Sequence, residues 1–307
     1  MINVLNTILP VFVVILLGWL LRRLGMLPLE LLGPLNRLVF YLAIPAMIFR
    51  EVARASIREH FNLLLLMETL LPVAAVFGAG LLLARLFRLE AGKSGTFVQS
   101  CFHGNLGYIG LAVSYYLLGE AGFSRASILA GFLMLLQNFL SVVGLQGLAA
   151  ERSEAKRIWP LFRKIVGNPV ILSALAGIVF SLLRLPLPLP LDRLLSIVSG
   201  MALPLALLVI GASLSFRLIR INVTPALAAG LFKLVLLPAL GLALYSLSGF
   251  EPERFLPGLI LLAAPTATVT YVMAGEMHGS TDLASAAVSL TTMLSAISYI
   301  AWLGLLA

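Results

Sequence analysis

Long apolar runs, separated by short charged or Pro- and Gly-rich segments, make up almost the whole chain. A membrane-spanning helix needs about 20 predominantly apolar residues, and ten runs of roughly this length follow one another. They cover residues 5–24, 34–53, 61–86, 94–118, 123–149, 165–183, 191–216, 223–247, 255–276 and 282–306. The pattern predicts an all-α polytopic membrane protein with ten transmembrane helices.

Composition narrows the class of protein further. Of the 307 residues, 61% are hydrophobic and 11% are charged, whereas soluble domains carry about 45–50% apolar and about 25% charged residues. The net charge of +8 comes from scattered basic residues, which argues against a nucleic-acid binder. The single cysteine, Cys101, excludes an intrachain disulfide and a Cys-rich metal site. The first run follows no basic segment and exceeds a signal-peptide core, so we interpret it as a retained helix.

Basic residues predict the orientation, because they accumulate in cytoplasmic loops. With an external N-terminus, 13 of the 21 Lys and Arg residues fall in cytoplasmic connections and 7 in outer ones, while Lys233 lies inside a run. We therefore expect both termini to be external and the charged segment 151–164 to be a short cytoplasmic linker.

Prolines recur at a constant offset in the two halves of the chain. Pro10 and Pro169 are 159 positions apart, as are Pro45 and Pro204. This offset predicts a duplication, with residues 1–150 as the first five-helix repeat and residues 165–307 as the second. An odd number of helices inverts the second repeat in the membrane. Inverted repeats are typical of secondary transporters, whose substrate sites lie near the bilayer midplane.

Two of the runs contain helix-breaking residues at their centres. Residues 103–110 read His-Gly-Asn-Leu-Gly-Tyr-Ile-Gly, and residues 263–270 read Ala-Ala-Pro-Thr-Ala-Thr-Val-Thr. Glycine weakens a helix interior, and proline removes a backbone donor. Interrupted helices at corresponding positions of two halves indicate a binding site. Neither break contains Lys or Arg, so we expect an anion to be held by half-helix dipoles and neutral donors. The expected donors are Asn105, Thr266 and Thr268, together with the backbone N–H groups around Pro265.

The residues of both breaks resemble a known family of transporters. Asn105-Leu-Gly-Tyr-Ile-Gly-Leu-Ala112 is similar to the first crossover, Asn-x-x-x-x-Gly-x-Pro, of the auxin efflux carrier family. Residues 265–282, with Tyr271-Val-Met-Ala-Gly-Glu276 inside, resemble the plant signature Pro…Phe-Val-Phe-Ala-Lys-Glu. The number of expected spans resembles that of the short bacterial members of this family over the whole chain.

This resemblance implies a fold and a mechanism. The fourth and ninth spans would be crossed broken helices in a bile-acid-symporter-like arrangement. Spans 1, 2, 6 and 7 would form a scaffold, and spans 3–5 and 8–10 a transport domain that moves by an elevator-type mechanism. We keep the names scaffold and transport domain for these two groups.

The resemblance also implies roles for individual residues. The family's crossover Asn contacts a substrate carboxylate, which carries over to Asn105, and Gly107 and Tyr108 lie in the same motif. Ala112 stands where the family has a proline, and Thr270 replaces a second proline of the plant ninth span. The plant substrate, an indole acid, is therefore not carried over directly. Bacterial relatives imply a small carboxylate such as malate or malonate in the inner membrane, with an auxin-like acid as the further option.

Other polar residues inside the runs are candidates for coupling or gating. Glu68 and Lys233 lie in the third and eighth runs, where ionisable residues are functional candidates, and we expect them to pair with each other. His103 is either a site of proton coupling or a neutral hydrogen-bonding group. Glu276 is expected to be a gate or boundary residue. Gln137 adjoins Asn138, so at most one of the two side chains faces the crossover. The coupling ion, H+ or Na+, stays open, and no cofactor is expected.

Competing classes are separated by the residues that they require. The histidines His60, His103 and His278 lack the partners of a protease or metalloenzyme, so we do not expect an enzyme. A sodium-coupled organic-anion symporter of the bile-acid type and an anion channel remain the alternatives. A homodimer is left open.

Overall fold

The structure is a computed structural model, and it describes residues 2–54, 62–148 and 167–306. In these ranges the regular structure consists of helices, without a strand. Seven helical segments are long and apolar enough to cross a membrane. The prediction of an all-α polytopic membrane protein is thereby confirmed.

The helices follow the apolar runs closely. In the first half they are α1 (Ile2–Arg23), α2 (Leu29–Leu38), α3 (Ile44–Arg54), α5 (Leu63–Leu86), α6 (Ala91–Phe102) and α7 (Leu111–Gly147). In the second half they are α9 (Pro169–Leu182), α10 (Leu189–Ser199), α11 (Ala202–Ser213), α12 (Phe216–Ile221), α13 (Val223–Leu231), α14 (Leu237–Leu247), α15 (Pro252–Ala263), α16 (Val269–Glu276) and α17 (Thr281–Gly304). Three π-helical turns, η1 (Val39–Ala43), η2 (Leu106–Gly110) and η4 (Phe232–Leu236), precede α3, α7 and α14.

The number of long apolar segments, seven, is smaller than the ten expected runs for three local reasons. The second part of the fourth run and the fifth run join in one segment, Leu106–Gly147, although Gly119 kinks it with φ 65° and ψ −167°. The sixth run is described only from Pro169 onward, as a 14-residue helix. The ninth run is divided into α15 and α16. The order of apolar segments is as expected, and the ten-helix count stays a prediction.

Polar side chains cap the starts of three helices. The Asn62 side chain accepts a hydrogen bond from the backbone N–H of Leu65, and Asn168 does the same for Val170 at the start of α9. Ser280 caps α17. Helix starts expose unpaired N–H groups, which such side chains satisfy. These caps explain why the apolar helices begin at Leu63, Pro169 and Thr281.

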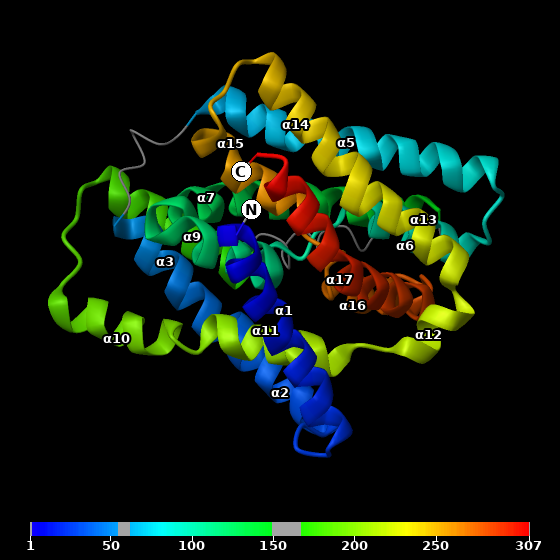
Figure 1. The fold of residues 1–307 in the computed structure, drawn as a ribbon, viewed down its shortest axis with the longest axis horizontal. Helices are drawn as coiled ribbons and strands as arrows, with labels where there is room; N and C mark the ends of the chain where they lie inside the picture. Colours follow the sequence, from blue (N-terminus) through cyan, green and yellow to red (C-terminus); the bar gives the residue numbers. More distant parts are fainter. Residues whose placement is uncertain (1, 55–61, 149–166, 307) are drawn as a thin grey trace.

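Among the described residues, the helices pack in pairs around one large hydrophobic core, beside a small second cluster. Helix α1 packs along α11, and α3 packs along α9; these four belong to the expected scaffold. Helix α5 packs against α14, and α13 packs against α17. In Figure 1, α1, α2, α3, α10 and α11 occupy the lower left of the view, and α5, α13 and α14 run along the top and right. The interrupted helices pack among the second group: α6 contacts α5 and α13, and α15 contacts α14.

Glycines allow the scaffold helices α1 and α11 to touch backbone to backbone. A Cβ atom on Gly211 would lie 1.8 Å from the carbonyl oxygen of Ile15, and one on Gly18 would lie 2.2 Å from that of Leu208. In lipid, helices associate through such close packing of small residues. The crossing of α1 and α11 therefore has no room for a larger residue.

We expect Gly211→Ala to destabilise the protein by about 1–3 kcal/mol or more, because overpacking forces the backbones apart. Thermal unfolding of the purified variant measures the loss. Gly33→Ala is the matched control, because a Cβ on Gly33 of α2 would meet nothing within 4 Å. An unchanged melting temperature for Gly211→Ala would contradict the close contact.

Candidate substrate-binding site

Both predicted interruptions are present in the structure. Helix α6 ends at Phe102, and His103 has extended backbone angles (φ −74°, ψ 99°) before η2 begins at Leu106. Helix α15 ends at Ala263, and α16 begins at Val269. The breaks therefore fall on the Gly- and Pro-containing residues that the sequence singled out.

The two breaks cross and pair with each other. Gly104 and Thr266 form an isolated antiparallel bridge. The backbone N–H of Asn105 donates to the carbonyl oxygen of Pro265 at 2.7 Å, and that of Ala267 donates to the carbonyl oxygen of His103 at 2.8 Å. Backbone groups released by the broken helices thus satisfy one another in a buried place, where unpaired groups would be costly.

Each break is held by a side chain from a helix that comes later in the chain. On α7, the Gln137 amide accepts from the backbone N–H of Gly104 at 3.1 Å and donates to the carbonyl oxygen of Phe102 at 3.2 Å. On α17, the Thr291 hydroxyl accepts from the backbone N–H of Thr266 at 3.0 Å. Gln137 therefore hydrogen-bonds to the backbone of the first break, and Thr291 does the same at the second break.

Removing the Gln137 amide should cost stability. Gln137→Ala leaves two buried backbone groups without partners, each at about 1–3 kcal/mol, so we expect a clearly lower melting temperature. The neighbouring Asn138→Ala is the matched control, because Asn138 donates only to the Met134 carbonyl of its own helix and is partly exposed. Equal melting temperatures for the two variants would show that Gln137 does not hold the break.

A buried lysine lies beside the crossing, where the sequence suggested only neutral groups. Lys233, in η4, is fully buried, and its Nζ donates to the carbonyl oxygen of Leu262 at 2.7 Å. A Cβ on Gly104 would lie 3.3 Å from this Nζ. None of the ion pairs among the described residues includes Lys233. Neither break itself contains Lys or Arg, as the sequence shows, but Lys233 reaches the second break from η4. An anion site made of neutral donors alone stays a prediction.

Asn105 presents an unused donor at the same place. The residue is 5% exposed, and its amide nitrogen Nδ2 has no hydrogen-bond partner in the described structure. Its own carbonyl oxygen accepts from the backbone N–H groups of Ile109 and Gly110, so the backbone is fixed while the side-chain amide is not. A buried amide nitrogen without a partner is costly, so this donor is available to a bound water or ligand.

The remaining candidate residues of the two breaks take different positions. Pro265 and Thr266 are buried in the crossing, whereas Thr268 is partly exposed at the start of α16. Gly107 lies in η2 near the Met134 side chain. The Tyr108 hydroxyl donates to the side chain of Asn36 on α2, so this tyrosine points away from the crossing.

His103 is fixed by a polar network behind the break. Its Nδ1 lies 2.8 Å from the Ser141 hydroxyl and 3.3 Å from Nε2 of Gln99. Ser141 in turn donates to the carbonyl oxygen of Gln137 at 2.7 Å. His103 therefore makes hydrogen bonds in this structure, and proton coupling, the other option from the sequence, stays a prediction. Ser141 and Gln99 were not predicted, because single polar residues in apolar helices carry no signal of their partners.

Glu68 and Lys233 have separate partners. Glu68 is buried on α5 and accepts a hydrogen bond from the Ser248 hydroxyl at the end of α14. The expected ion pair between Glu68 and Lys233 is therefore wrong, because Lys233 reaches the second break instead. Glu276 is exposed as the last residue of α16, a position compatible with the boundary role expected for it.

Comparisons with known proteins identify the family of the chain. The chain matches the family described as "Membrane transport protein" over residues 3–303. It is 32% identical to a Rhizobium meliloti protein named "Putative malonate transporter", with 96% of this chain and 93% of that protein aligned. It is 28% identical to an "Uncharacterized transporter" of Methanothermobacter thermautotrophicus, with 97% of this chain and 96% of that protein aligned.

A family match over nearly the whole chain, together with full-length relatives that are named transporters, confirms a transporter and not an enzyme. With its two paired breaks and apolar spans, the chain belongs to the membrane transport protein family, which is the auxin efflux carrier family that its motifs resemble.

Proposed function

We propose that the protein is a secondary transporter that moves a small organic anion, a carboxylate such as malonate or malate, across the cytoplasmic membrane. The anion binds at the crossing of the two interrupted helices. The transport domain, spans 3–5 and 8–10, then carries the site past the scaffold of spans 1, 2, 6 and 7 in an elevator-type movement. An auxin-like acid is the larger variant of the same substrate class.

The observation that carries this proposal is the pair of unused donors at the crossing. Lys233 has three N–H donors and uses one of them on Leu262, and Asn105 has a buried amide without a partner in the described structure. Gly104 directly precedes Asn105, and a Cβ atom on Gly104 would lie 3.3 Å from the Lys233 Nζ. A carboxylate accepts several hydrogen bonds, so one carboxylate would accept from both Lys233 and Asn105.

Electrostatics favours an anion at this depth. A buried, unpaired ammonium group is costly, and an isolated carboxylate in the membrane is costly as well. Bringing the two charges together removes much of both penalties, because the attraction is strong at low dielectric. The N-terminus of α16, which begins beside Thr268, adds the positive end of a helix dipole.

Equivalent contacts in the two halves support the inverted repeat on which the movement depends. Gly18 of α1 faces the carbonyl oxygen of Leu208, and Gly177 of α9 faces that of Phe49. The two glycines are 159 positions apart, and so are Phe49 and Leu208. The repeated prolines have the same offset. The contact of spans 1 and 7 thus recurs as a contact of spans 6 and 2.

The choice of substrate rests on the chemistry of the site and on the name of one relative. The crossing contains the cation of Lys233 together with neutral donors. The relative at 32% identity bears a name that refers to malonate. We therefore place malonate and malate first among the substrates, ahead of larger aromatic acids.

Counterflow in proteoliposomes tests the proposal. Vesicles loaded with unlabelled malonate should accumulate external radiolabelled malonate transiently and with saturation, with or without sodium. Flux that does not saturate and shows no counterflow would indicate a channel, and flux that requires sodium would indicate a symporter. Protein-containing vesicles without flux for malonate, malate or an indole acid would contradict the proposed substrate class.

We further propose that both termini are external and that segment 151–164 is cytoplasmic, on the basis of the basic residues in the connections. That segment lies outside the described residues. In a Cys101→Ala background, a cysteine introduced at Leu305 should react with an impermeant maleimide applied to intact cells. Labelling of a cysteine at Ser153 under the same conditions would reverse the orientation.

A further inference from the structure

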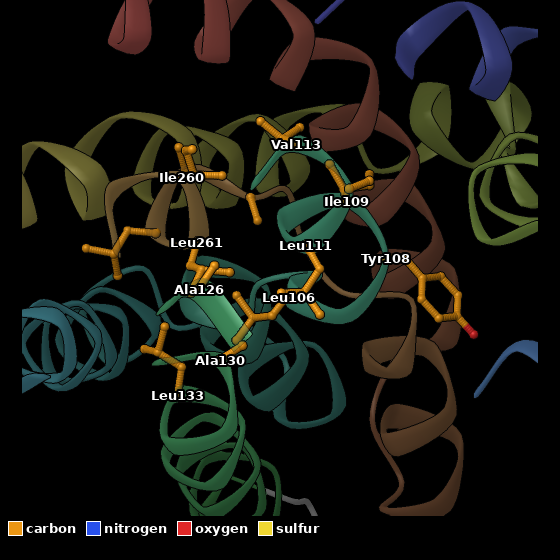
Figure 2. Close-up of a cluster of buried hydrophobic side chains, with 14 of the residues drawn as sticks. Leu106, Tyr108, Ile109, Leu111, Val113, Ala126, Ala130, Leu133, Ile260 and Leu261 are labelled. Atoms are coloured by element: carbon orange, nitrogen blue, oxygen red, sulfur yellow. The ribbon is translucent and has the colours of Figure 1, made fainter. Parts of the chain in front are cut away.

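Tyr108 connects the crossing to the scaffold. Its hydroxyl donates to Oδ1 of Asn36 at 2.5 Å. Tyr108 lies in η2, three residues after Asn105, whereas Asn36 lies on α2 of the second span. Figure 2 shows the Tyr108 ring standing apart from the aliphatic side chains around Leu106 and Leu111, with its hydroxyl directed away from them. This hydrogen bond therefore joins the two groups of helices that the elevator mechanism displaces.

A second hydrogen bond ties the same span to the transport domain. The Ser124 hydroxyl of α7 donates to the carbonyl oxygen of Glu51 on α3 at 3.1 Å. Asn36 and Glu51 are 15 positions apart in the second span, which corresponds to about 22 Å along a helix. The transport domain is thus held to span 2 near both of its ends.

The two bonds differ in what they hold. The Ser124 bond uses a backbone acceptor and lies far along the chain from the breaks. The Tyr108 bond starts in the helical turn that follows Asn105, and the backbone N–H groups of that turn bond back to the Asn105 carbonyl. A displacement of the crossing along span 2 therefore moves Tyr108 away from Asn36.

We infer that the Tyr108–Asn36 hydrogen bond is a latch that stabilises this one position of the transport domain against the scaffold. Tyr108 is then a positioning residue and not a substrate ligand. The inference rests on the proposed elevator movement, because a fixed protein would have no second position to disfavour. During transport the latch opens, and its strength sets the ratio of the two positions.

The test measures that ratio directly by pulsed electron–electron spin resonance in lipid nanodiscs. Spin labels go to Ile197 of α10 and Leu82 of α5, both exposed, in a Cys101→Ala background. Wild type should show two distances that represent the two positions. A neutral hydrogen bond contributes only modestly to stability. Tyr108→Phe should therefore lower the ratio of latched to unlatched molecules by about 2- to 10-fold.

Asn36→Ala should shift the ratio by the same factor, and the double variant should shift it no further, because both changes remove one bond. Tyr116→Phe on α7 is the matched control and should leave the ratio unchanged, since this tyrosine is half-exposed. Malonate affinity should change equally in Tyr108→Phe and Asn36→Ala.

Three results would overturn the latch. The first is an unchanged ratio in both variants while wild type shows two distances. The second is a set of effects that add in the double variant, and the third is a loss of affinity in Tyr108→Phe alone, which would make Tyr108 a ligand. A single distance in wild type, with and without malonate, would refute the elevator mechanism and the latch together.

Discussion

Lys233→Met should weaken carboxylate binding by about 30-fold or more and abolish saturable uptake. Methionine keeps most of the apolar stem but removes the charge. Truncating one partner of a buried, hydrogen-bonded charge pair costs about 2–5 kcal/mol, and about 1.4 kcal/mol corresponds to a tenfold change in affinity. The measurement is isothermal calorimetry with malonate, followed by counterflow in proteoliposomes.

The variant should still fold. The substitution would leave the Leu262 carbonyl oxygen without its donor, at about 1–3 kcal/mol, but it would also remove a buried charge that has no carboxylate partner among the described residues. A melting temperature near that of wild type is therefore expected without ligand. Stabilisation by malonate, which arises by mass action, should vanish.

Lys93→Met is the matched control for this prediction. Lys93 lies near the start of α6 and pairs with Glu90 through a partly exposed side chain. Its loss should leave malonate affinity as it is. Wild-type affinity in Lys233→Met would place the anion elsewhere in the protein.

Asn105→Ala should weaken binding by about one to two orders of magnitude. A hydrogen bond to a charged group contributes about 1.5–3 kcal/mol, and the amide nitrogen Nδ2 of Asn105 has no other partner in the described structure. For the same reason, removing it breaks no side-chain contact of that amide, so the melting temperature of the free protein should stay close to that of wild type. Calorimetry on the purified variant provides the affinity.

Two further variants sharpen the Asn105 test. Asn105→Asp should bind more weakly than Asn105→Ala, because it places a negative charge against the carboxylate. Asn222→Ala is the control, because Asn222 is also buried with an amide that lacks a partner in the described structure but lies at the start of α13, away from the breaks. Equal losses in Asn105→Ala and Asn222→Ala would point to a general effect on the fold.

The sequence predicts the helix interruptions well because their causes are local. Gly104 and Pro265 act on their own backbone, so the breaks can be located from residue types alone. The apolar runs are similarly local, since the membrane requires a length and not a partner. The boundaries of α5 and α17 accordingly follow the runs to within a few residues.

The polar partners could not be predicted because they depend on how distant helices pack. Lys233 and Glu68 carry opposite charges and suggest a pair, yet η4 directs Lys233 to the Leu262 carbonyl, and Ser248 binds Glu68. In the sequence, Gln137 and Thr291 look like any other polar residue in an apolar helix. Tyr108 belongs to the substrate motif in sequence, but its side chain bonds to Asn36 of another span.

The pairing of the two breaks also limits how the protein is made. Gly104 and Thr266 are 162 positions apart, which a ribosome covers in about 8–30 s at 5–20 residues per second. During this interval the first interrupted helix is already in the bilayer, while the strand-like partner for its backbone does not yet exist. Gln137, only 33 positions after Gly104, emerges much earlier. The nascent chain can therefore hold its first break with a side chain until the second half is inserted.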